Sequence, residues 1–120
     1  MLNTLILAAA LSATPATRAF DTAGFDALQK NGQPVVVLVA ADWCPTCRAQ
    51  DTALKDILAE PEFASLTLLR LDFDGQRDMA RSLKANSQST LIVFKAGKEM
   101  GRTVGDADPQ RLAALLRRAL

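Results

Sequence analysis

The chain contains two cysteines, and they stand three residues apart in the segment Trp43-Cys44-Pro45-Thr46-Cys47. A β-branched run ends just before them and Pro45 suits the first turn of a helix, so the pair is expected where a buried strand meets a helix. The free amides and positive dipole end of such a helix favour a thiolate on Cys44. Cys47, one turn further on, can close a small disulfide with it. The spacing therefore predicts thiol–disulfide exchange, with Cys44 as the nucleophile and Cys47 as the resolving thiol.

The remaining residue inventory excludes several other kinds of chemistry. Histidine and tyrosine are absent, so a Ser-His-Asp or Cys-His enzyme is excluded. A structural zinc site needs four ligands, usually Cys or His, so we expect no metal and no cofactor in the monomer. The formal net charge is +1, with 14 basic and 13 acidic residues mixed along the chain, which does not favour a nucleic-acid partner. A purely structural disulfide is an alternative, although it would close a very small loop and stabilise little.

Apolar periodicity and turn residues predict helices and strands that belong to a single domain. The order is α-β-α-β-α-β-β-α, which indicates an α/β fold with one sheet and helices packed on it. Ala96-Gly97 is a tight turn, so the last two strands must be antiparallel. The expected helices are 22–30, 45–59, 76–84 and 109–119, and the expected strands are 35–39, 66–71, 90–94 and 99–104.

Residues 1–19 have the pattern of a secretory signal peptide. The apolar part, 2–13, is too short to span a bilayer as a helix, and small residues follow it, so cleavage is expected near Ala16 or Ala19. No Lys or Arg precedes the apolar run, which argues against a signal, and an ordinary N-terminal helix or a disordered tail is the alternative. We expect 20–120 to form the domain. The expected location is the periplasm or cell envelope, with the cytoplasm as the alternative.

From position 20 onward the chain resembles the thioredoxin superfamily, in particular its small exported bacterial members. The resemblance rests on the buried strand before the cysteines, on Gly105, and on three segments: Asp42–Arg48, Arg70–Asp74 and Thr90–Glu99. It implies a thioredoxin-like fold with a central mixed sheet of about four strands flanked by helices, an exposed Cys44 and a buried Cys47. The candidate substrate-binding residues are Trp43, Pro45, Ser89 and Thr90. For Trp43 a role as a core aromatic is the alternative.

The sequence departs from the family pattern in three places. Leu38 occupies the position of a buried Asp that helps to move the proton of the second thiol, so Cys47 must lose its proton by another route, such as water or Asp42. Ser89 replaces the cis-proline that faces the cysteines, and because a non-proline cis bond costs about 3 kcal/mol we expect a trans bond there. Its hydroxyl or backbone is available to a cysteine sulfur. The family's first strand is also missing if the chain is cleaved at Ala19.

The leading hypothesis is a protein disulfide oxidoreductase that exchanges a dithiol or disulfide with protein cysteines and with an unidentified redox partner. We expect a monomer without a membrane span. A second hypothesis is a binding or chaperone module whose cysteines do not turn over, motivated by Leu38 and Ser89. A third is metal handling by a dimer that supplies four thiolates to a soft ion. The residues between the cysteines are neither charged nor aromatic, so they indicate no direction of electron flow.

Overall fold

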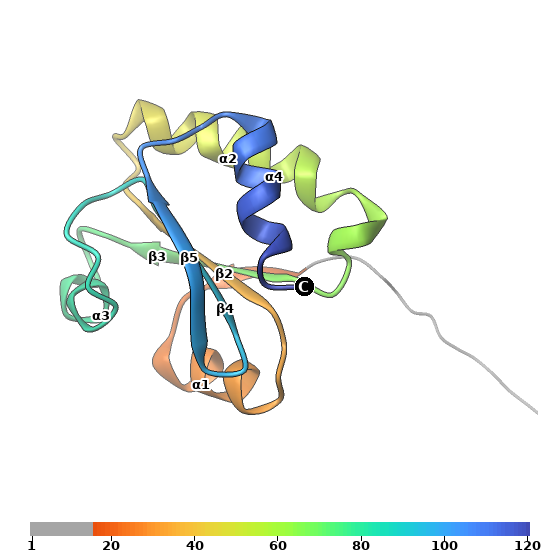
Figure 1. The fold of residues 1–120 in the computed structure, drawn as a ribbon. Helices are drawn as coiled ribbons and strands as arrows, with labels where there is room; N and C mark the ends of the chain where they lie inside the picture. Colours follow the sequence, from red (N-terminus) through yellow and green to blue (C-terminus); the bar gives the residue numbers. More distant parts are fainter. Residues whose placement is uncertain (1–15) are drawn as a thin grey trace, which may run out of the picture.

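The computed structural model of the chain describes residues 16–120, which form one five-stranded mixed sheet in the order β1-β3-β2-β4-β5 (Figure 1). β3 pairs in parallel with both β1 and β2, whereas the β2–β4 and β4–β5 pairs are antiparallel. The central strand β2 is buried along its whole length, as its β-branched run predicts. The strands are β1 (Ala16–Ala19), β2 (Val35–Ala40), β3 (Thr67–Asp72), β4 (Thr90–Lys95) and β5 (Lys98–Val104).

Helices cover both faces of this sheet, with α2 and α4 on one face and α1 and α3 on the other (Figure 1). Alternate residues of β2 therefore enter two separate cores. Val36 and Leu38 pack with Leu54 of α2 and Leu116 of α4, whereas Val37 faces the cluster under the other helices. The helices are α1 (Thr22–Lys30), α2 (Pro45–Leu58), α3 (Arg77–Ser82) and α4 (Pro109–Arg117), and a short 3-10 helix η1 (Pro61–Phe63) follows α2.

The predicted order of helices and strands from α1 to α4 and the mixed sheet are confirmed. α1 begins where the sequence predicts because the Asp21 carboxylate caps it and accepts a hydrogen bond from the Gly24 amide. The predicted hairpin turn is also present. Ala96 and Gly97 have φ angles of 51° and 84°, and such a pair of left-handed residues matches the twist of the two antiparallel strands that it joins.

A strand, β1, precedes the first helix, and the predicted order of elements did not include it. β1 pairs with β3 along its whole length, and the Phe20 amide then donates to the Arg70 carbonyl at 2.9 Å. The sequence analysis assigned residues 16–19 to a signal peptide and so expected no element there, whereas in the full chain these four residues add an edge strand. The rest of the expected signal peptide, residues 1–15, lies outside the described residues.

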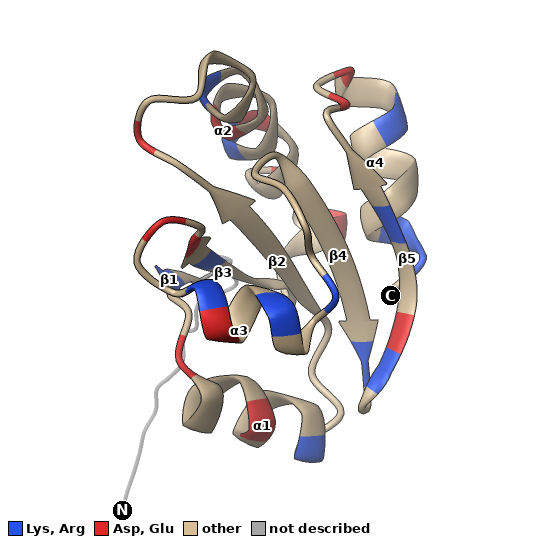
Figure 2. Ribbon diagram, turned by 90° about the vertical axis from the view of Figure 1, so that its left-hand side faces the viewer, with Lys and Arg blue, Asp and Glu red and all other residues tan. Residues whose placement is uncertain are grey.

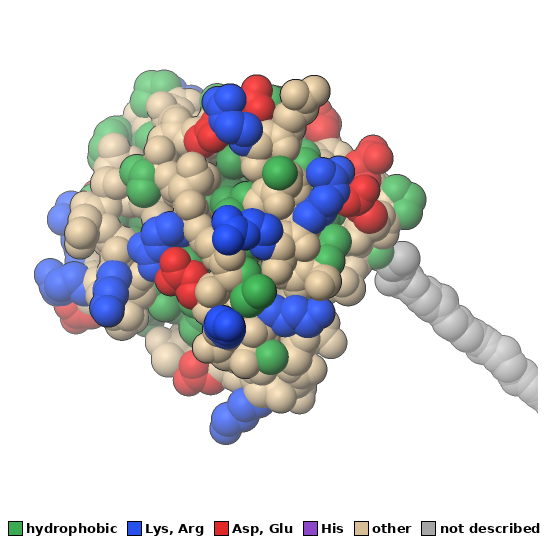
Figure 3. All heavy atoms as spheres, in the orientation of Figure 1, with side chains coloured by type: hydrophobic (Ala, Val, Ile, Leu, Met, Phe, Trp, Pro, Cys, Tyr) green, Lys and Arg blue, Asp and Glu red, His purple; other side chains and the backbone are tan. Residues whose placement is uncertain are grey.

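Charged residues of both signs lie on several helices and strands of the described chain. Lys and Arg positions and Asp and Glu positions are both spread along the ribbon in Figure 2. The face shown in Figure 3 likewise has basic and acidic groups interspersed with apolar ones. Among the residues that the structure describes, no helix combines the length and the apolar character needed to cross a membrane.

Candidate functional site

The two cysteines lie at the N-terminus of α2, directly after the loop that follows β2. Cys44 is the N-cap residue, with extended backbone angles (φ −89°, ψ 111°), and Pro45 is the first helical residue. The Cys44 Sγ accepts a hydrogen bond from the Cys47 amide at 3.1 Å. The sulfur thus takes the place that a Ser or Asp oxygen has at many helix N-termini. Both cysteines are free thiols and both are buried, and the predicted strand-to-helix junction is confirmed.

Ser89 lies on the loop before β4 and faces the cysteine pair. Its φ of +65° is in the left-handed region, and all peptide bonds of the described residues are trans, as expected for a serine here. The Ser89 amide donates to the Val39 carbonyl at 2.7 Å, and its carbonyl accepts from the Gly105 amide at 2.9 Å. These bonds hold a backbone conformation that costs a non-glycine residue about 1–2 kcal/mol.

The Ser89 hydroxyl contacts both sulfurs. Its Oγ lies 3.1 Å from the Cys44 Sγ and 3.2 Å from the Cys47 Sγ, in a buried position. Burial by itself raises the pKa of the Cys44 thiol. Hydrogen bonds from Cys47, Ser89 and the Thr46 amide outweigh that effect, so the pKa of Cys44 lies below its ordinary value. A lowered pKa gives Cys44 more thiolate at neutral pH.

Gln50, one turn after Cys47, is a candidate that the sequence analysis missed. It is fully buried, and its Nε2 donates to the Ser89 carbonyl at 3.0 Å and to the Asp106 carbonyl at 2.9 Å. Its Oε1 is buried without a hydrogen-bond partner among the described residues. A signal for it exists in the sequence: Gln50 lies between Cys47 and Leu54 on the buried stripe of α2, and a glutamine there must find polar partners.

Comparison with known proteins identifies the family. The family model described as Thioredoxin matches residues 16–118. The chain belongs to the thioredoxin family. It is 37% identical over 82 residues to a thioredoxin of Chlamydia muridarum (strain MoPn / Nigg), which covers 68% of this chain and 78% of that protein. It is 38% identical over 92 residues to a thioredoxin of Mycobacterium tuberculosis (strain ATCC 25618 / H37Rv), which covers 77% of this chain and 75% of that protein.

A solved structure supports the same conclusion at the level of the fold. Trxlp from Edwardsiella tarda EIB202 superimposes with a TM-score of 0.82 at 34% identity, and the match covers 84% of this chain and 98% of that one. The predicted thioredoxin-like fold is therefore confirmed. With the thioredoxins among its relatives and the pair Cys44 and Cys47 in place, the chain is a thiol–disulfide oxidoreductase.

Two features of the site differ from what the thioredoxin resemblance implied. Cys44 was expected to be exposed, but only 3% of its surface is accessible, because its side chain turns inward to the helix N-terminus and to Ser89. Leu38, at the position of the buried family Asp, is fully buried in the apolar cluster that also contains Cys47. The Cys47 sulfur is instead in contact with a side-chain hydroxyl, that of Ser89.

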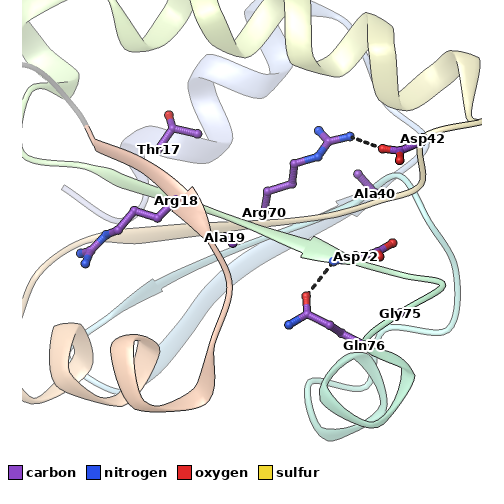
Figure 4. A pocket seen from close by; sticks show the side chains of 9 residues that line it. All are labelled: Thr17, Arg18, Ala19, Ala40, Asp42, Arg70, Asp72, Gly75 and Gln76. Atoms are coloured by element: carbon purple, nitrogen blue, oxygen red, sulfur yellow. Dashed lines mark hydrogen bonds and ion pairs between the residues drawn. The ribbon is translucent and has the colours of Figure 1, made fainter.

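Asp42, the other group considered for the Cys47 proton, is directed toward Arg70. Both residues line a cavity of about 500 Å³ at the carboxyl ends of β1, β3 and β2, and their side chains point toward each other (Figure 4). Their closest approach is 4.0 Å, and Arg70 also donates to both carboxylate oxygens of Asp51 at 2.7 and 2.8 Å. The Asp42 side chain is fully exposed, so water surrounds it. Ser89 thus contacts the Cys47 sulfur, whereas the Asp42 carboxylate is directed toward Arg70.

The other predicted substrate-binding residues lie at different depths. Trp43 is 58% exposed, and its Nε1 donates to the Asp74 carboxylate at 2.7 Å, so it is not a core aromatic. Pro45 is exposed as well. Thr90 is buried, and its hydroxyl donates to the Ser87 carbonyl at 2.8 Å. Trp43 and Pro45, the chain neighbours of Cys44, thus lie at the surface, whereas the Thr90 side chain is buried.

Metal ligands do not assemble around the pair within one chain. Across residues 16–120, no group of three or more His, Cys, Asp or Glu side chains is placed to hold a metal ion. The cysteine pair offers two thiolates, so a four-thiolate site would require a second chain.

Proposed function

We propose that the chain exchanges disulfides with protein cysteines, with Cys44 as the nucleophile and Cys47 as the resolving thiol. The observation that carries the proposal is the position of the Cys44 sulfur. The Cys47 amide and the Ser89 hydroxyl both lie 3.1 Å from it. Both groups can donate to a negative charge on the sulfur, and the thiolate is the form that attacks disulfides.

In the reducing direction, the Cys44 thiolate attacks one sulfur of a substrate disulfide, and the other substrate sulfur leaves as a thiolate. Cys47 then loses its proton, attacks the Cys44 sulfur and releases the first substrate sulfur. The substrate gains two electrons, and the enzyme dithiol becomes a disulfide. The same steps in reverse oxidise a substrate dithiol, and a separate redox partner restores the enzyme in either direction.

Turnover of insulin with dithiothreitol as the electron source tests the proposal. We expect Cys44→Ser to abolish turnover. Cys47→Ser is expected to stop after the first step, with a covalent Cys44–substrate adduct visible by intact mass. Ser82→Ala is the control, because the Ser82 hydroxyl is exposed and donates only to the Met79 carbonyl on α3. Wild-type turnover by Cys44→Ser would overturn the proposal, and partner capture retained by a variant lacking both cysteines would favour a binding module.

We propose further that protein substrates dock on Trp43 and Pro45. Large aromatic side chains contribute much of the binding energy of protein interfaces, and the hydrogen bond to Asp74 fixes the exposed Trp43 ring in advance. Trp43→Ala is expected to raise the KM for insulin about tenfold, a cost of about 1.4 kcal/mol, with a smaller loss for a small aromatic disulfide. Equal losses for both substrates would contradict a docking role for Trp43.

We also propose that the protein is exported to the periplasm or cell envelope and acts there as a monomer. The apolar run and the small residues after it support a signal peptide. Because β1 pairs with β3, cleavage after Ala16 would keep most of that strand, whereas cleavage after Ala19 would remove it. N-terminal sequencing of the protein from a periplasmic fraction is expected to begin at Thr17. An unprocessed chain found only in the cytoplasm would contradict export.

A further inference from the structure

Ser89 presents one hydroxyl to two sulfurs that must each become a thiolate during exchange. The distances from its Oγ to the Cys44 and Cys47 sulfurs are nearly equal, at 3.1 and 3.2 Å. A serine hydroxyl has one proton and rotates about its C–O bond, so it donates to one sulfur at a time and changes partner without moving its oxygen. The two thiolates are needed in succession and not together. One donor therefore suffices for both steps.

We propose that Ser89 is a catalytic residue whose hydroxyl donates first to the Cys44 thiolate and then to the Cys47 thiolate, stabilising each in turn. This inference rests on the proposed disulfide exchange and adds a group that acts in both of its steps. The need for such a donor is clear from the surroundings of Cys47, which lies in the same apolar cluster as Leu38 and Leu91. An anion formed there without a hydrogen bond would be costly.

The sequence of events balances without any further reactant. In the reduced enzyme the Ser89 hydroxyl donates to the Cys44 thiolate, which the Cys47 side chain also stabilises. Attack on the substrate breaks its S–S bond, and the other substrate sulfur leaves as a thiolate with the electron pair. The Cys44 sulfur is then part of a neutral mixed disulfide, a poor acceptor, so the hydroxyl turns to Cys47. Cys47 gives its proton to water, and its lone pair attacks the Cys44 Sγ. The bond to the substrate breaks, and the substrate sulfur leaves with the electron pair and takes a proton from water.

The hydroxyl oxygen keeps its position because the Ser89 backbone is held from three directions. Its amide donates to the Val39 carbonyl, and its carbonyl accepts from both the Gly105 amide and the Gln50 Nε2. Gln50 belongs to α2, the helix that carries Cys47, so its hydrogen bond fixes the Ser89 loop relative to the sulfurs. Gln50 is thus a positioning residue for Ser89.

Neutral groups dominate the environment of the pair. Burial raises the pKa of Cys44, and the groups that lower it again are hydrogen-bond donors of Cys47, Ser89 and Thr46. Removal of the Ser89 hydroxyl therefore takes away one hydrogen-bond donor and leaves the charged groups around the cysteine pair unchanged. The charged side chains nearby have other partners: Arg48 with the Asp42 carbonyl, Arg70 with Asp42 and Asp51, Asp74 with Trp43, and Asp106 with Arg111.

The first experiment measures attack by Cys44 alone, in a Cys47→Ser background, on an aromatic disulfide whose released thiolate is coloured. Adding Ser89→Ala is expected to slow attack about three- to tenfold at neutral pH, because a smaller fraction of Cys44 is thiolate. The effect stays moderate because each thiolate of the variant is a stronger nucleophile. In alkaline buffer, where the thiolate forms without help, the rate should equal or exceed that of the parent. A misplaced sulfur would react slowly at every pH, so a loss that persists in alkaline buffer overturns the inference.

The second experiment follows the resolving step in a chain that retains both cysteines. Samples quenched with acid at successive times give the formation and decay of the Cys44–substrate adduct by mass. Ser89→Ala is expected to slow the decay about three- to tenfold at neutral pH and to regain the wild-type rate in alkaline buffer. An unchanged decay rate at neutral pH overturns the role of Ser89 in the second step and with it the inference.

Two further variants make the result independent of folding defects. Ser89→Gly also removes the hydroxyl but accepts a φ of +65° without strain, so it must reproduce both effects of Ser89→Ala. Asp42→Asn is the matched control beside the pair, and an effect as large as that of Ser89→Ala would overturn the inference. If the parent chain forms no adduct, the proposed function itself fails. If the parent reacts and the Ser89 variants match it at neutral pH, only the role of Ser89 fails.

Discussion

At the scale of single residues, the loop before β4 has Ser89 at the position where the family pattern in the sequence analysis has a cis-proline. Ser89 donates its amide to the Val39 carbonyl, a bond for which proline has no hydrogen. Its φ of +65° is closed to proline, whose ring fixes φ near −65°. Its hydroxyl adds the contacts to both sulfurs. Each of these features requires a residue other than proline, so Ser89 is more than a neutral replacement.

Ser89→Pro is therefore expected to destabilise the fold instead of restoring a family feature. The variant loses a buried hydrogen bond and cannot adopt the observed φ, which together should cost about 3 kcal/mol or more. Urea unfolding of the reduced protein measures the change. Ser89→Gly is the control: it also loses the hydroxyl, but it relieves the positive φ and keeps the amide, so its loss should be smaller than that of Ser89→Pro. Wild-type stability of Ser89→Pro would show that the loop also accepts the cis conformation.

The lowered pKa of Cys44 predicts how the reactivity of this residue depends on pH. Because the folded-state pKa is lowered, alkylation of Cys44 by iodoacetamide should have its midpoint below that of an ordinary thiol and should return to the ordinary value in denaturant. The lowered pKa of Cys44 also contributes to the stability of the folded chain. This contribution is complete above the unfolded-state pKa of Cys44 and is lost as the pH falls through its folded-state pKa. Equal midpoints in the folded and unfolded chains would contradict the hydrogen-bond pattern at Cys44.

At the scale of elements, the sequence predicts those segments whose local signals agree with their tertiary setting. α1 and α4 start after the capping residues Asp21 and Asp108, and β2 is a β-branched run that is buried on both faces. β1 could not be predicted because its four residues carry no alternation of their own, and only the edge of β3 makes them a strand. The role of Gln50 was hidden for a similar reason: its partners are two carbonyls far away in the sequence.

The contribution of β1 can be measured by truncation. A chain that begins at Phe20 loses the whole β1–β3 ladder and exposes the edge of β3. A chain that begins at Ala16 keeps the ladder, and β1 covers that edge. Since each backbone hydrogen bond contributes about 1 kcal/mol, we expect the shorter chain to be less stable by about 2–4 kcal/mol in urea unfolding. Equal midpoints for the two chains would mean that β1 adds little to the domain, and cleavage after Ala19 would then be tolerated.

At the scale of the whole molecule, the oxidation state of the cysteines is linked to the stability of the fold. In the dithiol form, the Ser89 hydroxyl joins the loop before β4 to α2 through both sulfurs. A disulfide sulfur is a weak acceptor, so this connection weakens on oxidation. The contact therefore favours the reduced protein and makes the Cys44–Cys47 couple more oxidising than it would be without Ser89.

Ser89→Ala is accordingly expected to lower the reduction potential of the pair. A hydrogen bond to a charged group contributes about 1.5–3 kcal/mol, and about 30 mV corresponds to 1.4 kcal/mol for a two-electron couple, so the shift should be about 30–60 mV. Equilibration with glutathione followed by trapping of the free thiols measures it. Urea unfolding of both redox forms closes the thermodynamic cycle, because the reduced variant must lose more stability than the oxidised one by the same free energy. Equal losses in the two forms, with an unchanged potential, would show that the hydroxyl contacts the sulfurs without distinguishing their redox states.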